Sequence, residues 1–296
     1  MSQTASSENT QLEGRISVVI PCYNYAHYVA QTVESALSQQ HVREIIVVDD
    51  GSTDNSAQVV REVAAKHPQV TLLQQKNQGQ STARNTGFSH SSGEFVVFID
   101  ADDLFAPDAF EAQLRMLEEN PQCVFTFGHI QLIDADGKWF PTSFPFRPVT
   151  RHFLRESLRA PFILTPAAIL FRRSLLLEMG PFTKTYDDCE DHDMILRILE
   201  KHPICATNHL VALYRRHGNN VSNRSLKMAR TFIRVQMAHW PHIKHDRALR
   251  RACLQGMWSV VRWNIDKARS AVEVTVKNVA RPVSRPLLKW IRSKRA

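Results

Sequence analysis

The fold is decided by one stretch, Val96-Val97-Phe98-Ile99-Asp100-Ala101-Asp102-Asp103, in which four apolar residues run directly into three carboxylates. An apolar run of this kind predicts a strand that is buried on both faces of a sheet. Open α/β sheets bind their ligands at the carboxyl ends of the strands, which is where these acidic residues stand. The stretch therefore predicts an α/β fold with a ligand site just beyond Ile99.

The spacing of the acidic residues adds a chemical prediction. Asp100 and Asp102 are two residues apart, so on an extended backbone their side chains point to the same side. Two carboxylates on one side can hold a hard divalent cation, which prefers oxygen ligands. The alternative is a turn in which Asp102 or Asp103 caps the helix expected near Pro107, and this explains one acidic residue but not all three.

Strands and helices alternate ahead of this stretch. Short β-branched runs predict strands, and apolar residues at helical spacing predict the helices between them, the first at about 27–39. Such alternation predicts βαβ units and a mostly parallel sheet whose strands bring their carboxyl ends to one edge. Asp49 and Asp50 follow the second predicted strand, although turn chemistry before Gly51 is an alternative explanation for them. The predicted strands are 16–20, 44–48, 70–73 and 94–99.

The second half of the chain has a less regular pattern. A loop-dominated region is predicted at 140–162, where prolines and phenylalanines are frequent, and helices are predicted from Ser225 onward. Trp240, Trp258 and Trp263 are available there to pack back on the body. The other predicted elements are a helix after Pro107, a strand at 123–134 with a turn at 136–137, a helix end at 174–179 capped by Gly180, a helix at 190–201 and a strand at 209–214.

The composition is that of an ordinary globular protein, with 43% apolar residues in a chain of 296. Residues 1–14 are polar, are expected to be disordered, and contain no apolar signal region. The longest apolar stretch, 160–171, is interrupted by prolines and is too short to span a bilayer. The five cysteines are scattered without metal-ligand spacing, which predicts free thiols and a cytoplasmic protein.

The net charge of +8 is concentrated at the C-terminus. From Lys244 onward there are fourteen Lys or Arg and three acidic residues, a net charge of +11, so the rest of the chain has a charge of −3. Residues 281–296 combine Leu287, Leu288, Trp290 and Ile291 with cations, which is typical of a helix at an anionic membrane surface, here the inner face of the cytoplasmic membrane. A solvated, frayed terminus is the alternative. Nucleic-acid binding is not expected, because no recognised module accompanies the charge.

Six stretches, in this order, resemble the family 2 glycosyltransferases. Six motifs in the family's order are a far more specific signal than any single motif. The six stretches span about two hundred residues, and the resemblance stops near residue 225. It implies a Rossmann-like GT-A domain at 15–225 with a mostly parallel mixed sheet flanked by helices, followed by a helical basic C-terminal extension at 226–296. The stretches are ISVVIPCYN (16–24), EIIVVDDGSTDNS (44–56), NQGQSTARNTG (77–87), GEFVVFIDADD (93–103), CEDHDMILRILEK (189–201) and YRRHGNNVS (214–222).

The resemblance implies a nucleotide pocket beyond the first two strands. Pro21, Tyr23 and Asn24 would line it after the first strand. Asp50, after the second, would accept a hydrogen bond from the imide of uracil. Arg84 would face the nucleotide or its phosphates.

The resemblance also implies a metal site, because Asp100-Ala101-Asp102 stands where the family has its DXD motif. Asp102 would bind Mg²⁺ or Mn²⁺, and the metal would bridge the two phosphates of the donor. Asp100 would contact the ribose or a metal-bound water, and Asp103 would be a structural cap. His217 would reach the metal or the diphosphate, and a polar loop histidine is the alternative.

Two arginines precede that histidine. Arg215 and Arg216 could clamp phosphate, since a guanidinium binds phosphate oxygens through paired hydrogen bonds. One of the two is expected to be only a surface residue.

Glu190 and Asp191 resemble the acidic pair that opens a helix in this family. Asp191 would be the general base that removes the proton of the acceptor hydroxyl as its oxygen attacks the anomeric carbon. Attack opposite the leaving diphosphate would invert that carbon. The alternative is structural, because carboxylates at a helix N-terminus are favourable through capping and the helix dipole.

The resemblance therefore implies a metal-dependent inverting transferase of a hexosyl or N-acetylhexosaminyl group. The donor would be a nucleotide sugar, most simply a UDP-sugar, and the acceptor a glycan or lipid-linked hydroxyl in surface polysaccharide biosynthesis. One alternative is a nucleotide-sugar-binding scaffold without catalysis, which the joint presence of Asp50, Asp102 and Asp191 argues against. Another is a dinucleotide-binding oxidoreductase, but no glycine fingerprint follows the first strand.

Overall fold

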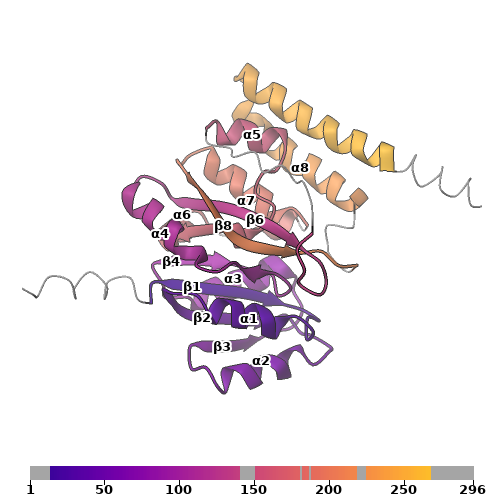
Figure 1. Ribbon diagram of the computed structural model, residues 1–296. Coiled ribbons are helices and arrows are strands. Elements are labelled where there is room, and N and C mark those ends of the chain that lie inside the picture. The colour runs from indigo at the N-terminus through magenta and orange to yellow at the C-terminus, as the bar shows by residue number, and fades with distance from the viewer. Residues whose placement is uncertain (1–13, 141–150, 181, 187, 219–224, 268–296) are drawn as a thin grey trace, which may run out of the picture.

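One eight-stranded mixed sheet runs through the protein, in the order β3-β2-β1-β4-β7-β6-β8-β5 (Figure 1). The computed structural model describes residues 14–140, 151–180, 182–186, 188–218 and 225–267. Residues 1–13 of the disordered segment predicted at 1–14, and the stretch 281–296 expected at a membrane surface, lie outside the described residues. The strands are β1 (Ile16–Cys22), β2 (Val42–Asp49), β3 (Val70–Gln74), β4 (Phe95–Phe98), β5 (Leu104–Phe105), β6 (Phe125–Ile133), β7 (Ile169–Arg172) and β8 (Cys205–Arg215).

Helices cover both faces of this sheet, and the C-terminal helices stack beyond it at the end opposite β3 (Figure 1). Their bounds are α1 (Val29–Leu37), α2 (Ser56–Ala64), α3 (Gln80–His90), α4 (Ala109–Glu119), α5 (Phe153–Arg159), α6 (Arg173–Met179), α7 (Glu190–Leu199) and α8 (Ser225–Ile243), with a further helix at 247–267. Short 3-10 turns lie at Pro166–Ala168 and Lys184–Tyr186.

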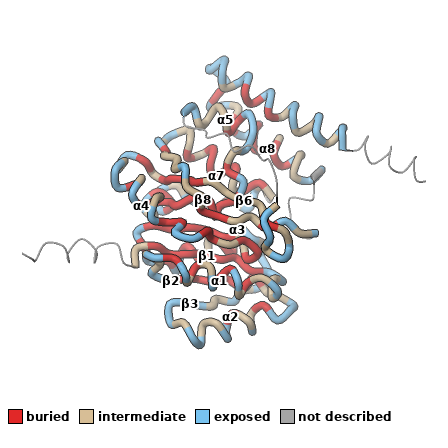
Figure 2. The backbone as a smooth tube through the Cα atoms, in the orientation of Figure 1, coloured by how far each residue is buried: buried red, intermediate tan, exposed pale blue. Residues whose placement is uncertain are grey.

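The N-terminal half confirms the predicted βαβ units. β3, β2, β1 and β4 are parallel neighbours, so their carboxyl ends meet at one edge, with Cys22 beside Asp49 and Val19 beside Phe98. Every residue of β1 and β4 is buried, as the red tube of β1 shows in Figure 2. Burial on both faces explains why these strands consist almost entirely of apolar residues. The predicted edge is therefore where the ligand site should be sought.

Close packing of α3 on this sheet depends on Gly87. A Cβ atom built there would lie 2.4 Å from Val19 and 3.2 Å from Val48, so only glycine lets the helix approach β1 and β2 this closely. This approach places the first turn of α3 next to the loops that follow the two strands.

The second half contains elements that the sequence pattern did not predict. β7 lies between β4 and β6 and is antiparallel to both, and two-residue β5 pairs with β8. Helix α5 lies within the region predicted to be loop-dominated, of which residues 141–150 lie outside the described residues. The turn at Gly137 and the helix end at Gly180 are confirmed, and both glycines have positive φ.

The C-terminal helices pack on the body through a separate apolar cluster between α5, α7, α8 and the helix at 247–267. Phe232 and Val235 of α8 and Cys253 of the last helix are buried there against Leu158 and Leu196, and Trp240 packs against the cluster. The prediction for the other two tryptophans is wrong: Trp258 is 64% exposed and Trp263 is 53% exposed. Trp258 points away from the cluster because it lies on the other side of the helix from buried Ala252 and Cys253.

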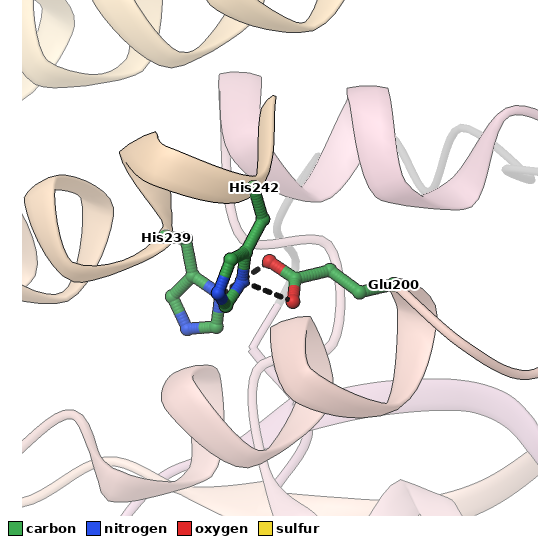
Figure 3. Close-up of side chains that lie close together, drawn as sticks. All are labelled: Glu200, His239 and His242. Atoms are coloured by element: carbon green, nitrogen blue, oxygen red, sulfur yellow. Dashed lines mark hydrogen bonds and ion pairs between the residues drawn. The ribbon is translucent and has the colours of Figure 1, made fainter. Parts of the chain in front are cut away.

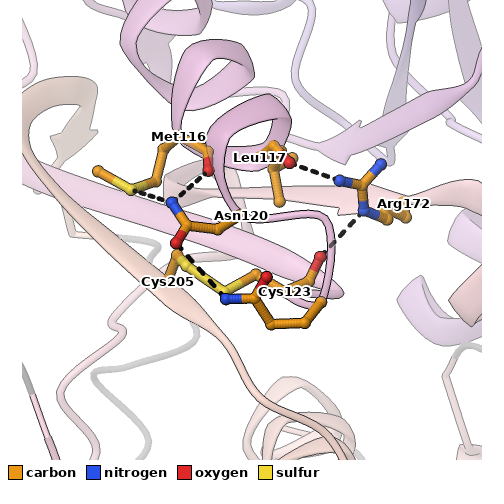
Figure 4. Close-up of a disulfide and its surroundings, with 7 residues drawn as sticks. Met116, Leu117, Asn120, Cys123, Arg172 and Cys205 are labelled. Carbon is orange, nitrogen blue, oxygen red and sulfur yellow. Dashed lines mark hydrogen bonds between the residues drawn. A yellow bond between two sulfur atoms is a disulfide. The ribbon is translucent and has the colours of Figure 1, made fainter.

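Cys123 and Cys205 form a disulfide between the starts of β6 and β8 (Figure 4). The prediction of five free thiols is therefore wrong for these two and right for Cys22, Cys189 and Cys253, which are buried and free. The pairing of β6 with β8 brings together cysteines that are 82 residues apart, which sequence spacing could not show. A cytoplasmic location remains a prediction, and this disulfide does not favour it.

Within the described part of the chain, no helix combines the length and the apolar character needed to cross a bilayer.

The disulfide predicts a definite number of reactive thiols. Protein purified without reductant, unfolded in guanidinium and alkylated with iodoacetamide should gain three carbamidomethyl groups by mass spectrometry, because only Cys22, Cys189 and Cys253 are free. The same protein reduced before alkylation should gain the two further groups of Cys123 and Cys205. Labelling of all five cysteines without reduction would restore the original prediction.

Candidate functional site

An open cavity of about 760 Å³ lies at the carboxyl ends of β1, β2 and β4. Its volume is within the range usual for small-molecule sites. The loops after these strands, the start of α3, the turn before α7 and the end of β8 form its walls, and Lys227 of α8 lies at its rim. Among its lining residues are Pro21, Tyr23, Asn24, Asp50, Gln80, Asp100, Ala101, Asp102, Asp188, Glu190, His217 and Lys227.

Asp50 and Asn24 shape the part of the cavity beyond β1 and β2. The buried carboxylate of Asp50 accepts hydrogen bonds from Gln75 Nε2 (2.7 Å), Gln78 N (2.9 Å) and Gly79 N (2.8 Å). Asn24 has a positive φ, and its Oδ1 accepts a bond from Thr53 N at 2.7 Å. Both side chains therefore hold neighbouring loops as well as line the cavity. Asp49 accepts one bond from Ser52 N in the turn that follows β2 and one from Gln74 Nε2 of the neighbouring strand β3.

The acidic stretch beyond β4 is folded differently from the prediction. Residues 101–102 form a turn, so Asp100 and Asp102 are not on an extended strand, although both line the cavity. Asp100 Oδ1 accepts bonds from Gln80 Nε2 (2.7 Å) and Arg84 Nη2 (2.6 Å). This engaged oxygen faces the protein, not a ligand.

Arg84 is buried and binds two carboxylates at once. Its Nη1 lies 2.5 Å from Glu190 Oε1, its Nη2 lies 2.6 Å from Asp100 Oδ1, and its guanidinium stacks on Phe182. Burial lowers the pKa of Arg84, but the charges of Asp100 and Glu190 outweigh this and raise it, so the side chain remains a cation. The predicted contact of Arg84 with the nucleotide does not fit this placement, because its guanidinium lies behind two acidic groups of the wall.

Asp102 and His217 are brought together from positions 115 residues apart. His217 Nε2 lies 2.8 Å from Asp102 Oδ2, and both side chains are largely buried. The imidazole ring stacks on Tyr28 with ring centroids 5.2 Å apart and meets Tyr25 edge-on. The alternative of an isolated loop histidine is therefore not supported for His217.

Asp103 and Arg215 form the structural support under this pair. Asp103 is fully buried and accepts bonds from Arg215 N (2.9 Å) and Thr165 Oγ1 (3.2 Å), so it anchors β8 and does not cap a helix as predicted. The buried guanidinium of Arg215 donates to the carbonyls of Asp102 and Ala135. A phosphate clamp does not fit Arg215 for this reason, whereas Arg216 is exposed.

The three neighbouring carboxylates of Asp100, Asp102 and Asp103 are chemically suited to a divalent cation. Burial raises the pKa of Asp102, and the charge of Asp100 raises it further, although the hydrogen bond with His217 opposes the shift. Burial together with the charges of Asp102 and Asp100 raises the pKa of Asp103 well above its usual range. A positive ion would relieve this repulsion, and the carboxylate and imidazole of Asp102 and His217 are ligands that Mn²⁺ and Mg²⁺ accept. The residues present therefore fit the predicted metal.

Asp191 lies on the first turn of α7, next to the cavity-lining Glu190. Its Oδ1 accepts a bond from the backbone N–H of His192 at 2.7 Å. Burial and the charge of Glu190 raise the pKa of Asp191 to about 7, although Arg84 lowers it. A carboxylate with a pKa near neutrality is suited to general-base catalysis. Asp191 is half-buried and is not itself among the lining residues of the cavity, so its approach to a substrate remains a prediction.

Several cavity residues were missed by the sequence analysis. Gln80, inside the recognised stretch 77–87, fixes Asp100, and Tyr28, shortly after the recognised stretch 16–24, supports His217. Lys227, from the C-terminal extension, forms a 2.7 Å ion pair with Asp188 at the cavity rim. No sequence signal distinguishes Lys227 from the other basic residues of the extension, so only the folded arrangement could reveal it.

Comparison with known proteins finds relatives of this chain. A sequence model described as glycosyl transferase family 2 matches residues 17–180. Chondroitin synthase of Escherichia coli is 31% identical over 214 residues, which cover 71% of this chain and 30% of the synthase. The chain thus spans less than a third of that curated relative.

Solved structures share the fold. S. aureus TarS 1-349 in complex with UDP-GlcNAc has a TM-score of 0.65 at 19% identity and covers 83% of this chain and 73% of its own. The mannosyltransferase PcManGT of Pyrobaculum calidifontis, in complex with GDP-Man and Mn²⁺, has a TM-score of 0.63 at 22% identity, covering 94% of this chain and 83% of its own. At these identities the likeness establishes the GT-A fold of the chain.

The double ion pair of Arg84 predicts a large cost for its removal. Arg84→Met leaves the buried Glu190 and the partly buried Asp100 without their shared cation, so the free energy of unfolding in urea should fall by about 3–5 kcal/mol. Arg84→Lys keeps the charge but lacks the two-pronged guanidinium, and its loss should be smaller.

Arg115→Met is the matched control. Its pair with Glu111 joins side chains that are 64% and 61% exposed, so its removal should change the free energy of unfolding by no more than about 0.5 kcal/mol. Equal losses for Arg84→Met and Arg115→Met would show that the buried network does not stabilise the site.

Proposed function

This chain belongs to glycosyl transferase family 2, and we propose that it moves a hexosyl or N-acetylhexosaminyl group from a UDP-sugar to a hydroxyl of a glycan or lipid-linked acceptor. The observation that supports this most strongly is that one cavity gathers Asp50, the pair Asp102 and His217, and the acidic first turn of α7. The similarity to chondroitin synthase, and to a structure with UDP-GlcNAc, favours this donor class and a role in surface polysaccharide synthesis.

Asp50 is proposed to recognise the nucleobase of the donor. Two of its three hydrogen bonds end on Oδ1 and one on Oδ2. Because a carboxylate oxygen can accept two bonds, Oδ2 retains an acceptor position for the imide N–H of uracil. Pro21, Tyr23 and Asn24 line the same part of the cavity and would contact the nucleoside there.

Asp102 and His217 are proposed to hold Mg²⁺ or Mn²⁺ together with the donor phosphates. Such an ion, when bound, would neutralise charge on the departing diphosphate. Asp100 is proposed to contact the ribose through Oδ2, because Oδ1 is engaged by Gln80 and Arg84. Exposed Arg216 is the remaining arginine for a phosphate contact.

Asp191 is proposed to take the proton of the acceptor hydroxyl. The acceptor oxygen forms a bond to the anomeric carbon as the bond from that carbon to the diphosphate oxygen breaks. The bonding electron pair leaves with the diphosphate, and the proton moves to the carboxylate of Asp191. Attack from the face opposite the diphosphate inverts the anomeric carbon. Glu190 keeps its ion pair with Arg84 during this transfer, which leaves Asp191 as the carboxylate that accepts the proton.

A peripheral contact of the C-terminal tail with anionic membrane lipid is also proposed. The stretch 281–296 that suggested it lies outside the described residues. The preceding helix at 247–267 exposes Leu254, Trp258 and Trp263, and apolar groups of this kind accompany cations at membrane interfaces. A cytoplasmic location would place this surface at the inner face of the membrane.

Asp191→Asn tests the catalytic assignment. By calorimetry, the variant should bind UDP-sugar within about threefold of the parent affinity. The substitution is isosteric, and the proposed uracil site at Asp50 is elsewhere. Release of UDP in the presence of oligosaccharide acceptors should fall by about 10²–10⁴-fold, the usual contribution of a general base. Transfer at the parent rate would show that another group takes the proton. A parent that binds UDP-sugar but transfers to no acceptor would instead identify a scaffold protein.

The pH profile gives an independent readout of the same residue. The base acts only when deprotonated, and its pKa is raised to about 7, so kcat/KM of the parent should rise with pH and level off above this value. The residual rate of Asp191→Asn should lack this rise. A parent profile that is flat across neutrality would contradict the assignment.

A further inference from the structure

Three side chains meet at the junction of α7 and α8, away from the cavity (Figure 3). Glu200 follows the last turn of α7, and His239 and His242 lie one turn apart on α8. His239 Nδ1 is 2.6 Å from Glu200 Oε1, and His242 Nδ1 is 2.7 Å from Glu200 Oε2. Each residue offers one ligand atom, and these atoms all lie within 4.8 Å of one another.

A second carboxylate orients the buried histidine of this group. His239 Nε2 lies 3.4 Å from Asp193 Oδ1, and Asp193 is held in turn by Arg197 Nε at 3.0 Å. In the tautomer whose proton lies on Nε2 and is shared with Asp193, Nδ1 carries a lone pair that can bind a metal. This arrangement of carboxylate, histidine and metal is the usual support of a metal-ligating histidine.

We propose that Glu200, His239 and His242 bind one Zn²⁺ ion. Two imidazole nitrogens and one carboxylate oxygen are a common zinc ligand set, and a water molecule completes four-coordination where the site is open. The site is open on one side, because the side chain of His242 is 62% exposed while that of His239 is buried. Two nitrogen ligands also separate this site from the oxygen-rich region around Asp102, which suits Mg²⁺ or Mn²⁺.

The geometry needs two adjustments: the contacts with Glu200 must lengthen, and the two histidine nitrogens, which lie within 4.8 Å of each other, must come to the spacing of zinc ligands. Ligand atoms of a tetrahedral zinc ion lie roughly 3.3 Å apart, as follows from metal–ligand bonds of roughly 2.0–2.1 Å. The present contacts of 2.6 and 2.7 Å would therefore each lengthen by less than about 1 Å. Rotation of the exposed His242 and the flexible Glu200 side chain can supply this movement while buried His239 stays in place.

The site would fasten the C-terminal extension to a helix of the transferase domain. Helix α7 begins at Glu190 and Asp191 and ends beside Glu200, and α8 brings Lys227 to the cavity rim. An ion at their junction would therefore fix the relative position of two elements that both reach the cavity. Its role would be to hold these elements in place and not to take part in the transfer.

The competing explanation is that protons alone hold the three residues together. Burial lowers the pKa of His239, but the hydrogen bonds with Asp193 and Glu200 outweigh this and raise it to about 9. A protonated histidine could thus form ion pairs with both carboxylates without any metal. Direct measurement of zinc binding separates the two explanations.

The experiment uses the full chain with Asp102→Asn, which removes the proposed ligand of the other metal site. After treatment with EDTA and its removal, the protein is titrated with Zn²⁺ by calorimetry and with Co²⁺ by visible absorption. We expect one Zn²⁺ per chain, d–d absorption of bound Co²⁺, and a zinc-dependent rise in Tm. Adding His242→Ala should weaken zinc binding by more than about tenfold and remove the rise in Tm.

His245→Ala is the matched control, because His245 is exposed three residues beyond His242. Added to the Asp102→Asn chain, this substitution should leave Zn²⁺ binding unchanged. Glu200→Gln, which keeps the side-chain shape, should weaken binding as His242→Ala does. The proposal is overturned if the parent binds no Zn²⁺ in the micromolar range, or if His242→Ala and His245→Ala bind it equally well.

Discussion

The site depends on one buried cation that holds carboxylates from two distant parts of the chain. Arg84 binds Asp100, beyond β4, and Glu190, at the start of α7, in a region where acidic groups would otherwise repel one another. Because the guanidinium is planar and permanently charged, it can fix both groups in a single geometry. The charge of Arg84 offsets part of this repulsion, while burial and neighbouring carboxylates still raise the pKa values of Asp102 and Asp191. Arg215 has the same kind of role below them, since it joins Asp102, Asp103 and β8.

The fold of the N-terminal half could be predicted because its signals are local. Apolar runs such as 95–98, with acidic residues at their ends, predict buried parallel strands and a ligand site at their carboxyl edge. The six motifs predict that Asp50, Asp102 and His217 share one site, and all three line the cavity. The Asp102–His217 contact joins residues 115 positions apart. It forms because β8 pairs with β6 and its end carries His217 to the turn that contains Asp102. Motif position could suggest this contact, whereas local pattern could not.

The remaining errors come from interactions that the linear pattern does not record. Arginines near a phosphate site were assigned to phosphate, but burial selects Arg84 and Arg215 as partners of carboxylates and carbonyls. The Cys123–Cys205 disulfide depends on strand pairing across 82 residues, and β5 exists only because β8 is beside it. The C-terminal extension is predicted only as a helical basic segment beyond the resemblance, yet Lys227 reaches the cavity and α8 packs on α7. The sequence resemblance ends near residue 225, but the structure does not separate there, because α8 packs on the transferase domain.

The central claim is that the cavity binds a nucleotide sugar with the help of a divalent ion, and ligand-induced stabilisation of the full chain tests it most directly. Tm would be measured with UDP-glucose, UDP-N-acetylglucosamine, UDP-glucuronate, GDP-mannose and NAD, each with Mn²⁺ or with EDTA, in the parent and in Asp102→Asn. Because a ligand that binds only the folded state raises Tm, at least one UDP-sugar should do so with Mn²⁺, and the effect of Mn²⁺ should disappear in Asp102→Asn. Stabilisation by NAD and by no nucleotide sugar, or equal stabilisation by UDP-sugar in Mn²⁺ and in EDTA, would contradict the account.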